Sequence, residues 1–196
     1  MNKGYVLQNN NILQKPLNEN CTPVVCGDRS DFSKIYDEVF PILYRVALRI
    51  TRSGEAAEDL CQDSFFQLYN KQMQFAKPEE AKYWLIRVVK NASINYSKRK
   101  IKEREVYQKA FRQQKTTTDD GESDFIKKED IEAVQIALHK LPKALSSVLI
   151  YKEYADMNYK EIGAALGISE GNVKVRVFRA RERLTAIMTK MQGENK

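Results

Sequence analysis

The sequence contains few of the residues that end helices and shape tight turns, with 8 glycines and 5 prolines among 196 residues. A β-sandwich or a turn-rich barrel uses many more of both, so the composition argues against either fold. Hydrophobic residues make up 42% and charged residues 30% of the chain, which is enough to bury a core in one ordinary domain or in two small ones. We therefore expect a mostly helical protein and not a large multi-domain enzyme.

Long apolar runs are absent as well. No stretch approaches the ~18 uninterrupted apolar residues that a membrane-spanning helix needs. Residues 1–14 lack the basic start and the apolar block of a signal peptide. We therefore expect a cytoplasmic protein.

Cysteine is scarce, and Cys21, Cys26 and Cys61 make an odd number in a chain without an export signal. A disulfide framework is therefore not expected. Cys21 and Cys26 are spaced so that both could hold a metal ion, but no nearby histidine or third cysteine completes such a site. Two ordinary thiols are the favoured interpretation, and we expect neither a metal nor a cofactor.

Basic residues outnumber acidic ones by 33 to 26, and the resulting net charge of +7 favours polyanionic partners. The basic residues are densest in residues 98–115, and the next stretch, TTTDDGESD (116–124), has the composition of a flexible linker. We place a domain boundary there. The predicted organisation is a polar, disordered tail (1–30), a first domain (31–112), a linker (113–127) and a second domain (128–191).

Apolar residues recur at helical spacing through both predicted domains. In the first helix Pro41 should bend or divide the run, and in the second Cys61 falls on the inward face. Asn158 and Glu161 form a capping pattern, and Gly167 is placed to end the helix that follows. The helices we expect span residues 31–50, 55–69, 128–140, 143–154, 158–167 and 169–191, with a further helix that begins at residue 78 and becomes strongly basic.

The last two helices, joined by a tight turn at residues 167–169, have the pattern of a helix-turn-helix. At ~100° per residue, six apolar side chains of the longer helix fall on one stripe that should face the core. These are Val173, Val177, Ala180, Leu184, Ile187 and Met191.

The opposite side of that helix carries Val175 and Phe178 among cations, and burial alone does not explain this pair. Lysine and arginine can contact phosphates or guanine edges, while valine and phenylalanine can contact thymine methyl groups. This face is therefore predicted to read DNA. The alternative is a solvated basic face with two isolated apolar residues.

Three long segments resemble one family. LPKALSSVLIYKEYADMNYKEIGAALGISEGNVKVRVFRARERL (141–184) resembles region four of bacterial sigma factors, while AEDLCQDSFFQLY (57–69) and YWLIRVVKNASINYSKRK (83–100) resemble region two of the extracytoplasmic-function (ECF) group. The resemblance implies an all-α initiation factor of two small helical domains that is not an enzyme. It would bind the β′ and β subunits of core RNA polymerase, read the minus-thirty-five promoter element, melt the minus-ten element, and be restrained by an anti-sigma factor.

The resemblance also assigns roles to residues. The surface that reads the minus-thirty-five element would consist of Asn172, Lys174, Val175, Arg176, Phe178, Arg179 and Arg181. The minus-ten element would be bound by Phe75, Tyr83, Asn91, Asn95, Lys98, Arg99 and Lys100 through base stacking, base-edge hydrogen bonds and phosphate contacts. Many relatives carry Asp and Arg where this chain has Asn95 and Lys98, so the base preference is left open.

Core polymerase would be bound by Glu58, Asp59, Gln62 and Asp63, which fall at helical spacing and form an acidic strip on a basic protein. Two other interpretations of the strip remain: a solvated helix face, or a Mg²⁺ site for nucleolytic chemistry, which lacks an accompanying base or nucleophile.

A stand-alone helix-turn-helix regulator is the alternative to the sigma-factor function as a whole. The single histidine, His139, has no catalytic neighbour in the sequence and is expected at the surface.

Overall fold

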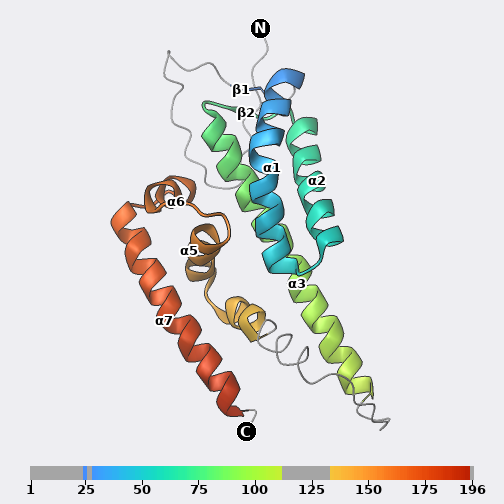
Figure 1. The fold of residues 1–196 in the computed structure, drawn as a ribbon, viewed down its shortest axis with the longest axis vertical. Helices are drawn as coiled ribbons and strands as arrows, with labels where there is room; N and C mark the ends of the chain where they lie inside the picture. Colours follow the sequence, from blue (N-terminus) through green and yellow to red (C-terminus); the bar gives the residue numbers. More distant parts are fainter. Residues whose placement is uncertain (1–23, 26–27, 112–132, 195–196) are drawn as a thin grey trace.

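The computed structural model describes residues 24–25, 28–111 and 133–194. In these residues the chain is almost entirely helical, so the expected all-α fold of two helical units is confirmed (Figure 1). The elements are β1 (Val24–Val25), α1 (Arg29–Thr51), α2 (Gly54–Asn70), β2 (Gln74–Phe75), α3 (Pro78–Phe111), a helical segment at 133–140, α5 (Lys143–Glu153), α6 (Tyr159–Leu166) and α7 (Glu170–Glu194). Cys21 and Cys26 lie outside the described residues.

The N-terminal half is a bundle of α1, α2 and α3. Helix α1 begins after Asp28, whose carboxylate accepts hydrogen bonds from the backbone amides of Ser30 and Asp31. It continues without interruption past Pro41, so the expectation that this proline could divide the helix is wrong. Buried Val39 and Leu43 flank the proline and hold both parts of the helix on the same core.

The start of the N-terminal half differs from the prediction. Arg29 and Ser30 already belong to α1, and β1 pairs antiparallel with β2, with Val24 opposite Phe75. The predicted tail (1–30) therefore includes all of β1. A pairing of two residues across about fifty positions of sequence leaves no periodic signal, because the signal of a strand needs several alternating residues.

The C-terminal half packs α5 and α6 against α7. Asn158 and Glu161 form the predicted capping box, with hydrogen bonds of 2.9 and 2.8 Å, and Gly167 ends α6 with a φ of 68°. A side chain at Gly163 would come within 2.7 Å of the Ile168 carbonyl oxygen, so this glycine allows the close turn between α6 and α7. The turn therefore sets the angle of the helix-turn-helix.

Candidate nucleic-acid interface

Helix α7 presents one face to the core and the other to solvent. Of the six residues of the predicted stripe, Val173, Val177 and Ala180 are buried, whereas Leu184, Ile187 and Met191 are half-buried. On the opposite face the side chain of Phe178 is 63% exposed and that of Val175 is 47% exposed. Two large apolar side chains therefore stand in solvent on the second helix of a helix-turn-helix, where DNA-binding proteins contact base edges.

The polar residues predicted beside this pair are mostly accessible. Asn172, Lys174 and Arg179 are exposed, whereas Arg176 is half-buried. The Lys174 ammonium lies 3.0 Å from a Glu170 carboxylate oxygen, an exposed pair that DNA phosphates can replace at little cost.

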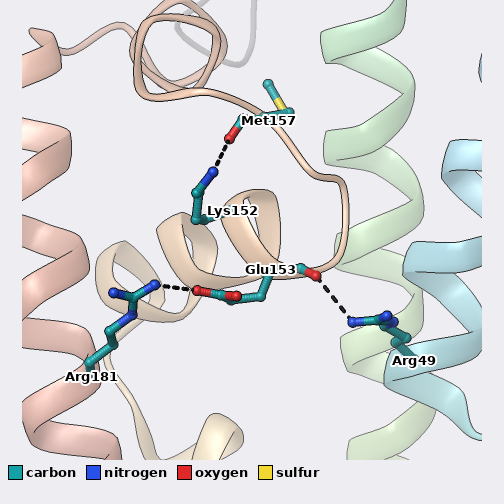
Figure 2. Close-up of polar contacts among 5 residues, drawn as sticks. All are labelled: Arg49, Lys152, Glu153, Met157 and Arg181. Atoms are coloured by element: carbon teal, nitrogen blue, oxygen red, sulfur yellow. Dashed lines mark hydrogen bonds and ion pairs between the residues drawn. The ribbon is translucent and has the colours of Figure 1, made fainter.

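Arg181, another member of the predicted set, forms an ion pair with a side chain of another helix. Its guanidinium donates a 2.6 Å hydrogen bond to the Glu153 carboxylate at the end of α5 (Figure 2). That hydrogen bond, together with the charge of Glu153, raises the pKa of Arg181. Arg181 therefore joins α5 to α7, and it would have to exchange this partner to contact DNA.

The acidic strip lies on α2, where the side chains of Glu58, Asp59, Gln62 and Asp63 are all exposed. Gln62 donates a 3.2 Å hydrogen bond to Glu58, which places these two side chains on one face of the helix.

An exposed aromatic patch, which the sequence did not reveal, adjoins this strip. Phe66 is 65% exposed and Tyr69 is also exposed, and a shallow hollow of about 350 Å³ lies beside them. The hollow is lined by Phe32, Tyr36, Gln62, Phe65, Phe66 and Tyr69. Phe65 is buried and Phe66 is exposed. Which of two adjacent phenylalanines points outward depends on the exact rotation of the helix. The Phe65–Phe66 pair was therefore the only sign of this patch in the sequence.

The residues predicted for the minus-ten element lie on β2 and α3. Asn91, Asn95, Lys98, Arg99 and Lys100 are exposed along α3. The Arg99 guanidinium lies 5.6 Å from the centre of the Tyr96 ring, and the Lys100 ammonium lies 3.1 Å from Glu103. The basic part of α3 therefore offers amide and cationic groups to solvent, as single-stranded nucleic acid requires.

Phe75 and Tyr83, the two aromatic residues of this set, are both half-buried. The Phe75 ring lies 6.4 Å from that of Trp84, so part of its surface is covered by its own domain. Burial raises the pKa of Tyr83, and the carboxylates of Glu161 and Glu79 add to the rise. Since Glu161 belongs to α6, the C-terminal half stands close to Tyr83.

His139 is half-buried and is not the surface residue we expected. Its Nε2 atom lies 3.0 Å from the Ser97 hydroxyl of α3, and burial together with the nearby Lys98 lowers the pKa of the imidazole. The expectation failed because the covering surface comes from the other half of the chain. No local sequence signal could have shown this contact.

Comparison with known proteins identifies the family. The family model of sigma-70 region 2 matches residues 35–103, and that of sigma-70 region 4 matches residues 131–184. The RNA polymerase sigma factor YlaC of Bacillus subtilis is 29% identical over 170 residues, which cover 86% of this chain and 98% of that protein. The ECF RNA polymerase sigma factor SigM of the same organism is 29% identical over 163 residues, covering 79% and 93%.

The chain is an ECF sigma factor of the sigma-70 family. It is therefore a transcription initiation factor that directs RNA polymerase to promoters, and it is not itself an enzyme. Among solved structures, CnrH in complex with the cytosolic domain of CnrY shares the fold, with a TM-score of 0.54 and 19% identity over 84% of this chain and 91% of that one.

Two further findings concern the alternatives to a sigma factor. Within the described ranges, no three histidine, cysteine or acidic side chains come together as metal ligands would. The family assignment overturns the nuclease interpretation of the strip around Asp59, because sigma factors carry out no chemistry of their own.

No helix among the described residues is both long and apolar enough to cross a membrane.

Proposed function

We propose that this sigma factor divides its work between surfaces of opposite charge. The acidic strip and the adjoining aromatic patch on α2 bind core RNA polymerase, while α3 and α7 bind promoter DNA. The observation that carries the proposal is the exposed pair Val175 and Phe178, standing among cations on the outer face of α7 while the other face is buried. Such a face suits the base edges of a major groove.

The polymerase-binding part rests on chemistry typical of protein interfaces. Exposed aromatic side chains such as Phe66 and Tyr69 supply buried area and form binding hot spots. The carboxylates of Glu58, Asp59 and Asp63 steer a basic partner and set its register. We assign this combined surface to the polymerase, whose basic helical elements would cover the aromatic side chains.

For the minus-ten element, the exposed amides Asn91 and Asn95 face solvent one helical turn apart on α3 and can hydrogen-bond the edges of unpaired bases. Lys98, Arg99 and Lys100 continue the same helix and would hold phosphates. Strand opening is then driven by trapping unpaired bases. Phe75 and Tyr83 contribute stacking only through the part of each ring that is left exposed.

We further propose that the protein works in the cytoplasm, where its polymerase is found, and that an anti-sigma factor restrains it. CnrH, which shares the fold, was solved with a bound protein partner, the cytosolic domain of CnrY. Such a partner could bind the acidic and aromatic surface of α2 or the outer face of α7.

Run-off transcription with purified core polymerase and genomic fragments tests the proposal. We expect start sites that depend on the added protein, and their absence would contradict the proposal.

The charge reversal Asp59→Lys should weaken binding to core polymerase while leaving DNA binding unchanged, and Arg179→Ala should have the opposite effect. Glu38→Lys, the same charge reversal at an exposed position of α1, is the control. It should alter neither polymerase binding nor DNA binding. If Asp59→Lys and Arg179→Ala impair the same step, the division of labour is wrong.

A further inference from the structure

A hollow lined by basic side chains lies between α3 and the helical segment at 133–140 (Figure 1). Its volume is about 340 Å³, at the lower end of the range of ~300 to 1,000 Å³ that is usual for small-ligand pockets. The lining residues are Lys98, Ile101, Lys102, Ile136, His139 and Lys140. Three of them are lysines, one is a histidine, and none is acidic.

The two walls of the hollow resemble each other. On α3, Lys98 and Lys102 stand one helical turn apart with Ile101 beside them, and on the facing segment Ile136 and Lys140 also stand one turn apart. The lysines are exposed, and both isoleucines are half-buried. Each wall therefore offers an ammonium group next to an apolar side chain. Such walls suit a ligand with a strongly anionic part and a smaller apolar part.

His139 links the two walls. Its Nε2 atom lies 3.0 Å from the Ser97 hydroxyl of α3, so the half-buried ring is held in place at the hollow. Among the described residues the Nδ1 atom has no hydrogen-bond partner. If the Ser97 hydroxyl donates to Nε2, Nδ1 carries the ring proton and can donate it to an anion.

The positive charge of the hollow is not neutralised by the described residues. Their ion pairs involve other cations, namely Arg99, Lys100, Lys174 and Arg181. Like charges one helical turn apart, as on Lys98 and Lys102, destabilise a helix. After burial, the charge of Lys98 is the second cause that lowers the pKa of His139. A bound anion would offset the repulsion among these cations.

The number of cations favours a ligand with more than one phosphate. A single terminal phosphate carries ~1.5 to 2 negative charges at pH 7, which leaves part of the charge of three lysines unbalanced. Two linked phosphates come closer to balancing it. The DNA backbone carries a single charge on each phosphate, so one backbone phosphate in the hollow would balance least of all.

We propose that this hollow is a binding site for a small anion with two linked phosphate groups, either inorganic pyrophosphate or the diphosphate of a nucleotide. The ammonium groups of Lys98, Lys102 and Lys140 bind the phosphate oxygens. In the nucleotide, Ile101 and Ile136 contact the base or the sugar. The inference goes beyond the proposed function, although Lys98 also belongs to the predicted minus-ten surface. A filled hollow would therefore compete with DNA for that lysine.

His139 is the only histidine in the chain, so its NMR signals report on the hollow without a label. The full-length protein is titrated with sodium pyrophosphate, with ADP and with sodium sulfate at constant ionic strength. The diphosphates should shift the His139 signals saturably and raise the pKa of the imidazole, because a nearby anion favours its protonated form. Sulfate should bind at least tenfold more weakly. Whichever of pyrophosphate and ADP saturates at the lower concentration identifies the source of the diphosphate group.

Variants at two exposed lysines test the site without altering the predicted DNA-binding residues. Lys140→Met removes one ammonium group and should weaken diphosphate binding by about tenfold or more. Lys102→Glu places a carboxylate in the hollow and should abolish binding. Lys160→Met, at an exposed position of α6, is the control for the loss of one charge and should bind as the unaltered protein does. Circular dichroism checks that each variant is folded.

The proposal is overturned if neither diphosphate shifts the His139 signals more than sulfate does, or if Lys140→Met binds them as tightly as the unaltered protein. It is also overturned if a minus-ten single strand shifts these signals and the diphosphates do not, because the hollow would then belong to the DNA-binding surface. Failure of the proposed function gives a different result: no promoter-dependent transcript, while the diphosphates still shift His139.

Discussion

Replacing Lys90 by methionine is expected to strengthen docking of the two halves and to remove most of its pH dependence. Burial lowers the pKa of Lys90 from 10.5 to about 8 in the docked protein, with Arg87 and Lys143 adding to the effect. In an undocked chain the ammonium is solvated and its pKa returns to the ordinary value. Docking therefore releases a proton between about pH 8 and pH 10.5, and it becomes more favourable as the pH rises through this window.

The magnitude follows from the size of the shift. A change from 10.5 to about 8 is about 2.5 pH units, or ~3 kcal/mol at ~1.4 kcal/mol per unit, lost from docking when Lys90 is charged in both states. Methionine has a similar shape and no charge, so it recovers this loss at pH 7. The Ser147 hydroxyl of α5, which accepts a 2.9 Å hydrogen bond from the Lys90 ammonium, then loses its partner, which costs ~1 to 2 kcal/mol. The net gain should be ~1 to 2 kcal/mol at pH 7.

Small-angle scattering of the full-length protein can measure this. With increasing pH from 7 to 10, the radius of gyration of the unaltered protein should fall towards the compact value of about 16 Å. Lys90→Met should already be compact at pH 7 and change little. Tyr151, the nearest titratable group on α5, does not interfere, because burial raises its pKa above its usual value of 10. Lys160→Met, an exposed change on α6, controls for the loss of one charge. Parallel pH curves for Lys90→Met and the unaltered protein would refute the reasoning.

Three further predictions follow from single side chains. Burial raises the pKa of Cys61 to about 12, so its thiol should resist iodoacetamide at pH 8 and react only after unfolding, as peptide mapping by mass spectrometry would show. Asn158→Ala removes the side-chain half of the capping box and should cost ~1 kcal/mol of stability in thermal unfolding, whereas the exposed Asn172→Ala should cost less. Phe178→Ala should change stability by less than ~0.5 kcal/mol yet weaken binding of a minus-thirty-five duplex in fluorescence anisotropy; unchanged binding would contradict its assigned role.

Features set by neighbours in the sequence were predictable. The capping box of Asn158 and Glu161, the left-handed Gly167 and the buried stripe of α7 each depend on residues within a few positions. The burial of Cys61 followed from the periodicity of α2 in the same way. These local signals were sufficient to place the helix-turn-helix and the outward position of Phe178.

Features created by docking were not predictable. The sequence placed His139 at the surface and gave Lys90 no role, because both are covered by residues more than forty positions away. The pairing of Val24 with Phe75 was missed for the same reason. Hydrophobic periodicity reports only that a face is apolar, so a polar face buried against another domain is read as solvent-exposed.

Helix α3 shows why polar contacts between the two halves of the chain are hard to predict from the sequence. One face carries Leu85 and Val89 into the core of the N-terminal half, a second carries Lys90 and Ser97 towards the C-terminal half, and a third presents Asn91 to solvent. At ~100° per residue these faces interleave, so adjacent residues such as Lys90 and Asn91 serve different purposes. The face of α3 that contacts the C-terminal half and the face that carries the exposed amides therefore differ only by a rotation about the axis of one helix.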